Sequence, residues 1–188
     1  MIRLTGGQRK GMILSAPKGH LTRPATSRVR QWIFDVTGSP SGLSVLDLFA
    51  GTGAVGLEAL SRGADTVFFI ENWQPAIDCL HRNIRKTRYS DRSEVLVSGV
   101  ERAATDLLRG DRRFDLCFCD PPYRYDVLEE LLDESVLDLI APGGTLIVEH
   151  RGEPPLAPRG LLPYREEKFG DTVVSLWIDL HISQEKSL

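Results

Sequence analysis

The tetrapeptide Asp120-Pro121-Pro122-Tyr123 is the segment whose residue types most clearly suggest chemistry. The Asp120 side chain and the Pro121 carbonyl are hydrogen-bond acceptors, and the prolines hold the chain extended without N–H donors of their own. Two such acceptors could hold the N–H bonds of a nucleobase amino group, so that its lone pair faces a methyl donor and Asp120 helps remove the proton. Tyr123 would stack on a base rotated out of its helix. The alternative is a rigid loop, because Asp-Pro commonly begins a turn.

A glycine-rich segment, residues 51–56, follows an apolar run and opens a helical pattern, and Glu71 ends the next apolar run. This arrangement matches the dinucleotide-binding fingerprint, in which the acidic residue accepts hydrogen bonds from ribose hydroxyls. Asp47, just ahead of the glycines, would repel a pyrophosphate but suits the ammonium and sulfonium groups of S-adenosylmethionine. A cap on the glycine turn is the alternative role for Asp47, and it is compatible with either ligand.

We therefore expect S-adenosylmethionine as the cofactor, S-adenosylhomocysteine as its product, and no metal ion. The predicted cofactor-binding residues lie at or after three successive strands: Asp47, Phe49, Gly51, Gly53, Glu71, Asn72, Gly99 and Val100. Residues 98–101 could read the adenine edge, although Glu101 could simply begin a helix, where an acidic residue is favoured. Trp73 could border the adenine or belong to the core.

Apolar runs alternate with helical patterns from residue 44 onward, which predicts an α/β fold with a mostly parallel, seven-stranded sheet and helices on both faces. We expect strands at 45–49, 66–70, 94–97, 114–119 and 145–148, and helices at 54–62, 75–86, 102–108 and 127–140. Two further runs around Gly170-Asp171 predict a terminal antiparallel hairpin. Asp120 directly follows one of the strands, at the sheet edge where ligands of such folds bind.

Residues 1–34 differ from the rest of the chain in charge: they contain no acidic residue and seven basic ones, Arg3, Arg9, Lys10, Lys18, Arg23, Arg28 and Arg30. Such a segment attracts a polyanion, so we predict that these seven side chains bind RNA; a solvated basic face is the alternative. Alternating apolar residues broken by glycines predict a small β-hairpin arm at residues 1–14. Thr26 or Ser27 should cap a helix that Gly38 and Pro40 close.

The expected organisation is a basic arm with the start of a linking helix at 1–34, a catalytic domain at 35–182 and a flexible tail at 183–188. The three cysteines, Cys79, Cys117 and Cys119, lack metal-ligand spacing and are expected to be reduced core residues. The chain has no apolar stretch of membrane-spanning length and no secretory signal, which predicts a soluble, cytoplasmic protein.

The sequence resembles the RsmD family of bacterial 16S rRNA (guanine-N2)-methyltransferases. Three segments carry the resemblance: residues 45–64, residues 120–123 and residues 23–30, with similarity extending through 169–172. Many amino-methyltransferases share the first two, whereas the third and the glycine-containing arm narrow the choice. Ala25, Ser27 and Gln31 depart from the family pattern, which leaves the hydrogen bonding of that segment open.

The resemblance implies a Rossmann-like class I methyltransferase fold and N2-methylation of a specific guanine in 16S rRNA. It further implies a substrate within the small ribosomal subunit or an assembly intermediate, a monomeric enzyme and no membrane partner.

Four other functions compete with this interpretation. A DNA or RNA adenine-N6 methyltransferase uses the same tetrapeptide, but DNA enzymes of this kind usually need a separate sequence-reading region, and only the arm lies outside the expected sheet. A protein-glutamine methyltransferase would usually carry Asn in place of Asp120. An NAD-linked oxidoreductase leaves Asp47 and the tetrapeptide without roles. A non-catalytic ribosome-assembly factor would explain the basic arm but not Asp120 and Tyr123.

Overall fold

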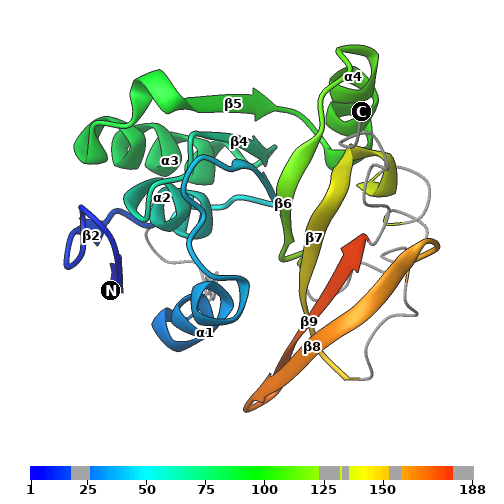
Figure 1. Cartoon of the computed structure of the whole chain (residues 1–188). Coiled ribbons are helices and arrows are strands. Elements are labelled where there is room, and N and C mark those ends of the chain that lie inside the picture. The colour runs from blue at the N-terminus through cyan, green and yellow to red at the C-terminus, as the bar shows by residue number, and fades with distance from the viewer. Residues whose placement is uncertain (18–25, 123–131, 133–135, 153–157, 180–188) are drawn as a thin grey trace.

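The computed structural model describes residues 1–17, 26–122, 132, 136–152 and 158–179. Its centre is a seven-stranded sheet, and a separate two-stranded hairpin forms the N-terminal arm (Figure 1). The hairpin strands are β1 (Ile2–Arg3) and β2 (Ile13–Leu14). The sheet strands are β3 (Ser44–Leu48), β4 (Thr66–Glu71), β5 (Ser93–Val97), β6 (Phe114–Cys119), β7 (Ile140–His150), β8 (Leu161–Phe169) and β9 (Thr172–Asp179).

The helices begin and end at residues suited to those positions. Thr26 caps α1 (Ser27–Thr37) by accepting a hydrogen bond from the Val29 N–H, and Gly38 follows with φ of 79°. Arg88 ends one helix in the left-handed conformation, with φ of 61°. The remaining helices are α2 (Ala54–Ser61), α3 (Gln74–Thr87) and α4 (Val100–Arg109), with 3₁₀ turns η1 (Ser90–Arg92) and η3 (Leu137–Leu139).

The order of the strands locates a switch point in the sheet. The order is β5-β4-β3-β6-β7-β9-β8, with β5 to β7 parallel and β9 antiparallel to both of its neighbours. The chain moves outward from β3 to β4 and β5, and then crosses back to lay β6 on the other side of β3. In such sheets ligands bind in the crevice beyond the carboxyl ends of the two strands at the switch. Those ends carry the glycine loop and Asp120.

Each face of the sheet is covered by a separate apolar core. Helices α1 and α2 and the arm pack on one face against side chains such as Val45, Phe118 and Ile147. Helix α4 and η3 pack on the other face against Leu46, Cys117 and other strand residues. Alternate residues of each strand therefore point to opposite faces, as the period of two in a strand requires. The three cysteines are all buried, as expected.

The expected strands and the terminal hairpin are confirmed, but the predicted helix at 127–140 is wrong at its C-terminal end. Residues 137–139 form η3, and Ile140 already begins β7 because it pairs with Phe114 of β6. The remainder of that predicted helix lies almost wholly outside the described residues, as do residues 180–188, which include the predicted tail. Across the described ranges, no helix is long and apolar enough to cross a membrane.

The arm is attached to the rest of the domain by polar contacts as well as by its buried side chains Leu4 and Leu14. The N–H of Gln8 donates to the Ser61 carbonyl at 2.7 Å, at the end of α2. Asn83 of α3 accepts from the Ser15 N–H at 2.7 Å and donates to the Ser15 carbonyl at 3.0 Å. The domain boundary at 34/35 stays a prediction; in the structure, α1 runs continuously across it.

Candidate active site

The loop after β3 turns sharply at the switch point. Phe49 has φ of 60°, a rare conformation for a bulky side chain, and Gly51 and Gly53 have φ of 56° and 76°. The loop is tied to β4, because the Ala50 N–H donates to the Ile70 carbonyl at 2.9 Å. Gly51 N–H donates to Oε2 of Glu71 at 2.7 Å. The sequence motif thus forms a turn that is locked to the next strand.

Two glycines of the motif are required by close packing, and Gly53 is required by its backbone conformation as well. A Cβ on Gly53 would lie 2.4 Å from Cδ1 of Leu80, and one on Gly56 would lie 2.3 Å from Cε1 of Phe69. The second contact joins α2 to β4, so any larger residue would push the helix off the sheet. This matches the role of the third glycine in the dinucleotide-binding fingerprint.

Glu71 holds the loop and also faces the crevice. Its Oε1 accepts from the N–H groups of Asn72 at 2.9 Å and Trp73 at 2.8 Å, while Oε2 accepts from Gly51. An ionised carboxylate has about four acceptor positions, so three N–H donors leave capacity for a hydroxyl donor. Glu71 is half-buried, and its side chain lines a pocket.

That pocket gathers most of the predicted cofactor-binding residues from three strand ends. It is lined by Phe49, Ile70, Glu71, Asn72, Ser98, Gly99, Val100 and Glu101. Gly51 adjoins it through its bond to Glu71. Gly53 lies behind the turn, against Leu80. Trp73, for which two roles were open, is not among the lining residues, although its N–H orients Glu71.

Asp47 occupies a buried position beneath the glycine turn. It is 2% exposed, and its Oδ2 accepts from the Gly56 N–H at 3.0 Å. Burial raises the pKa of Asp47 to about 7, the Gly56 hydrogen bond opposes this, and the Glu71 charge adds to it. The geometry therefore favours the capping alternative for Asp47, and a contact with the cationic groups of a cofactor stays a prediction.

Asp120 follows β6 on the other side of the switch. It is half-buried, Pro121 is buried and Pro122 is exposed, while Tyr123 lies outside the described residues. Burial raises the pKa of Asp120 well above its usual range, and the charges of Glu149 and Asp47 raise it further. A strongly perturbed carboxyl at a ligand-binding edge is typical of a catalytic group.

Glu149, near the end of β7, is a site residue that the sequence reasoning missed. It is 5% exposed, and within the described part of the chain its Oε2 has no hydrogen-bond partner. Burial raises the pKa of Glu149 to about 7, against the opposing effect of Arg30. The signal was present in the sequence, because Glu149 ends an apolar run just as Glu71 does.

The predicted RNA contact of Arg30 is contradicted by its position. Arg30 is 1% exposed, and its Nε lies 2.9 Å from Oε2 of Glu58, which is fully buried. Its Nη2 also donates to the Arg3 carbonyl at 2.6 Å. The guanidinium is turned inward because α2 presents a buried carboxylate that must be compensated. Arg30 joins α1, α2 and the arm instead of facing solvent.

The other predicted RNA-binding residues divide into three groups. Arg3, Lys10 and Arg28 are exposed, with Arg28 over the Phe169 ring at 5.6 Å. Arg9 is half-buried and engaged, since its Nε donates to the Thr87 carbonyl at 3.0 Å. Lys18 and Arg23 lie outside the described residues. Three of the seven side chains thus remain visible candidates for phosphate contacts.

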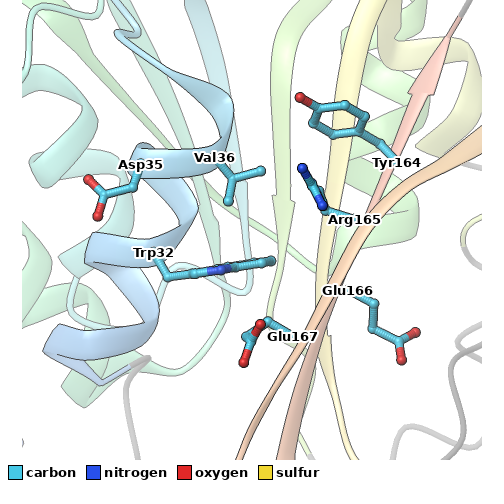
Figure 2. A pocket seen from close by; sticks show the side chains of 7 residues that line it. All are labelled: Trp32, Asp35, Val36, Tyr164, Arg165, Glu166 and Glu167. Atoms are coloured by element: carbon cyan, nitrogen blue, oxygen red, sulfur yellow. The ribbon is translucent and has the colours of Figure 1, made fainter.

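A second cavity, of about 320 Å³, lies between α1 and β8 on the Glu149 face of the sheet. Figure 2 shows the Trp32 ring and the Arg165 side chain directed into the gap from opposite sides, while Glu166 points away from the helix. The other lining residues are Asp35, Val36, Tyr164 and Glu167. Three carboxylates against one guanidinium disfavour a phosphate here, whereas the aromatic surfaces suit a neutral planar group.

Comparisons with known proteins extend over nearly the whole chain. Residues 2–178 match the model of a family described as conserved hypothetical protein 95. The putative rRNA methyltransferase YlbH of Bacillus subtilis is 32% identical over 182 residues, which cover 94% of this chain and 98% of that protein. The ribosomal RNA small subunit methyltransferase D of Escherichia coli is also 32% identical over 182 residues, which cover 94% of this chain and 89% of that protein.

A solved structure agrees with these matches. The putative methyltransferase yhhF from Escherichia coli has a TM-score of 0.81 and 32% identity, covering 96% of this chain and 98% of that one. The range matched by the family model contains the glycine loop, Asp120 and Glu149.

Proposed function

The chain belongs to the RsmD family, and from this premise we propose that it transfers a methyl group from S-adenosylmethionine to the N2 amino group of a guanine in 16S rRNA. The predicted Rossmann-like class I methyltransferase fold is confirmed by the sheet order and the structural match. The observation that carries the proposal is the position of Asp120, directly across the switch point from the glycine loop.

The pocket beside Glu71 fits the adenosine part of the cofactor. Glu71 has acceptor capacity for ribose hydroxyls, and the backbone of Gly99 and Val100 lies where an adenine edge would be read. The acidic groups Asp47, Asp120 and Glu149 favour a positively charged ligand over a pyrophosphate. The cofactor supplies an activated methyl group on a sulfonium centre; the protein binds and orients it.

Asp120 and its neighbours bind and orient the guanine amino group that accepts the methyl group. A guanine amino group is a weak nucleophile because its lone pair is delocalised into the ring. The Asp120 carboxylate and the Pro121 carbonyl accept hydrogen bonds from its two N–H groups and so direct the lone pair toward the methyl group. Asp120 then takes a proton from the methylated nitrogen. We propose that Tyr123 stacks on the flipped base, and that Arg3, Lys10 and Arg28 contact phosphates of the RNA.

Asp120→Ala tests this function directly. We expect the rate of methyl transfer to small-subunit rRNA to fall by at least about 10²-fold, because the acceptor and proton-transfer roles are lost together. Affinity for S-adenosylhomocysteine should stay within a few-fold of wild type, since Glu71 and the glycine loop are untouched. The substrate is small subunits from a strain lacking this protein, and nucleoside mass spectrometry identifies the product.

The matched control is Asp91→Ala, which removes an exposed carboxylate in η1, near the start of β5 and so at the opposite edge of the sheet. This variant should retain wild-type turnover. Full turnover of Asp120→Ala would refute the catalytic role. Formation of N6-methyladenosine in place of N2-methylguanosine would overturn the proposed substrate while leaving the reaction class intact.

A further inference from the structure

Acidic side chains from three adjacent strands meet on one face at the switch point. Asp47 of β3 pairs in register with Phe118 of β6, and Phe118 pairs with Ile147 of β7. The last pair, Cys119 with Val148, places the next residues, Asp120 and Glu149, side by side. Neighbouring strands are about 4.8 Å apart, so the two carboxyl groups come from backbones at that spacing.

Glu149 has no part in the mechanism described above, yet it is buried at a cost. Its Oε2 is shielded from solvent and has no hydrogen-bond partner among the residues that the structure describes. Burying a carboxyl oxygen without a hydrogen-bond partner is unfavourable, and more so when the group is charged. Such a group beside a reacting carboxyl calls for a functional reason.

Charged and titratable groups surround Glu149 on several neighbouring elements. Asp120 adjoins it at the end of β6, Asp47 lies one strand further on β3, and the positive charge of Arg30 acts on it from α1. Glu58 of α2 lies behind Arg30 and neutralises part of its charge. Two further titratable groups lie close in register or sequence: Glu167 of β8, two strands away on the same face, and His150, whose Nε2 is 2.9 Å from Ser175 Oγ.

We propose that Glu149 is a positioning residue that sets the ionisation of Asp120 and, through it, the pH range of methyl transfer. The Arg30 charge favours the ionised form of Glu149, whereas no cation among the described residues lowers the pKa of Asp120. Glu149 therefore ionises first. Two adjacent carboxyl groups that are shielded from solvent, one wholly and one in part, resist carrying two charges, so Asp120 keeps its proton to higher pH than it would alone.

The consequence for catalysis follows from the need for an ionised Asp120. In the transfer step the S–CH₃ bond breaks, sulfur keeps the electron pair and an N–CH₃ bond forms. The proton of the alkylated nitrogen then passes to the Asp120 carboxylate. A protonated Asp120 cannot accept that proton, so the acidic limb of the rate profile follows the pKa of Asp120. This kinetic consequence rests on the proposed function, whereas the coupling of the two carboxyl groups does not.

The coupling is measured by carbon-13 NMR of protein labelled at aspartate carboxyl carbons, titrated without RNA or cofactor. The Asp120 resonance is assigned by its loss in Asp120→Asn. We expect Glu149→Gln to lower the pKa of Asp120 by about one unit or more, because the neighbouring negative charge is gone. Glu94→Gln, an exposed carboxylate on β5, is the control and should leave that pKa unchanged. An unchanged Asp120 pKa in Glu149→Gln overturns the proposal.

Kinetics provide the functional measurement. Each unit by which the pKa falls makes single-turnover methyl transfer about tenfold faster at pH values below the wild-type acidic limb. A merely structural role for Glu149 would lower the rate at every pH without moving the limb, and that result would also count against the proposal. If the RNA is not a substrate at all, the NMR titration still decides the coupling.

A measurement on the wild-type protein covers the case in which Glu149→Gln does not fold. In protein labelled at both aspartate and glutamate carboxyl carbons, the Glu149 carboxyl should titrate at a lower pH than the Asp120 carboxyl, because Glu149 ionises first. Ionisation of Asp120 before Glu149 overturns the proposal.

Discussion

Removing the Arg30 guanidinium should destabilise the whole fold, although the residue lies in a segment whose charge suggests a surface role. Arg30 is 1% exposed and Glu58 is fully buried, with 2.9 Å between Nε and Oε2. Breaking a buried ion pair by deleting one partner costs roughly 3–5 kcal/mol, because the other charge is left uncompensated. Arg30→Met keeps most of the side-chain volume and removes only the charge and its hydrogen bonds.

The structure narrows this range to its lower part. Glu58 keeps a second partner, since Nη2 of Arg62 lies 3.0 Å from Oε1, and Thr5 also donates to that carboxylate. Arg62 is 20% exposed and so compensates Glu58 only partly. Loss of the bond from Arg30 to the Arg3 carbonyl adds about 1 kcal/mol. With about 3 kcal/mol for the ion pair and about 1 for this hydrogen bond, we expect Arg30→Met to lower the free energy of unfolding by about 4 kcal/mol.

Urea denaturation at pH 7, followed by circular dichroism, measures the effect. The control is Arg28→Met on the same helix, where an exposed guanidinium over the Phe169 ring contributes less than about 1 kcal/mol. The double variant Arg30→Met/Glu58→Leu should recover part of the loss, because an apolar pair replaces the stranded carboxylate. Equal stability of the Arg28 and Arg30 variants would refute the inward-facing role of Arg30.

Two further variants test the glycine loop and the buried acid beneath it. Gly56→Ala should destabilise the protein by more than 2 kcal/mol, since its Cβ would lie 2.3 Å from Phe69 and overpacking costs roughly 1–3 kcal/mol or more. The control in the same thermal-melting assay is Gly143→Ala: Gly143 has φ of 80°, but a Cβ there would have no atom within 4 Å, so this variant measures the smaller backbone cost alone. Folding raises the pKa of Asp47 from 3.8 to about 7, so its contribution to stability is present below pH 4 and is lost as pH rises through 7. Asp47→Asn keeps an acceptor for Gly56 and should gain on wild type by up to about 4 kcal/mol between pH 4 and pH 8; a difference independent of pH in urea denaturation would contradict this.

Local patterns in the sequence were sufficient to predict most helices and strands and the part of the site around the glycine loop and Glu71. The glycine loop, the strand before it and Glu71 are close in sequence, so their spacing alone predicted that they lie together; Phe49 and Glu71 do line one pocket. The helix cap was narrowed to Thr26 or Ser27, because capping depends on residues within one turn, and Thr26 is the cap in the structure. The end of the predicted helix at 127–140 was misplaced, because pairing of Ile140 with Phe114 is a long-range interaction that no local period reports.

What the sequence alone determined is therefore the class of fold, the glycine loop, the position of residues 120–123 directly after a strand and the chemistry that these residue types permit. The tertiary structure decided which charges face solvent and which carboxyl groups are neighbours. Arg30 looked like one more basic side chain until α2 brought Glu58 beneath it. Glu149 looked like a strand end until the register of β6 and β7 set it beside Asp120. Both facts depend on strand order and register, which are set by contacts between segments distant in the chain.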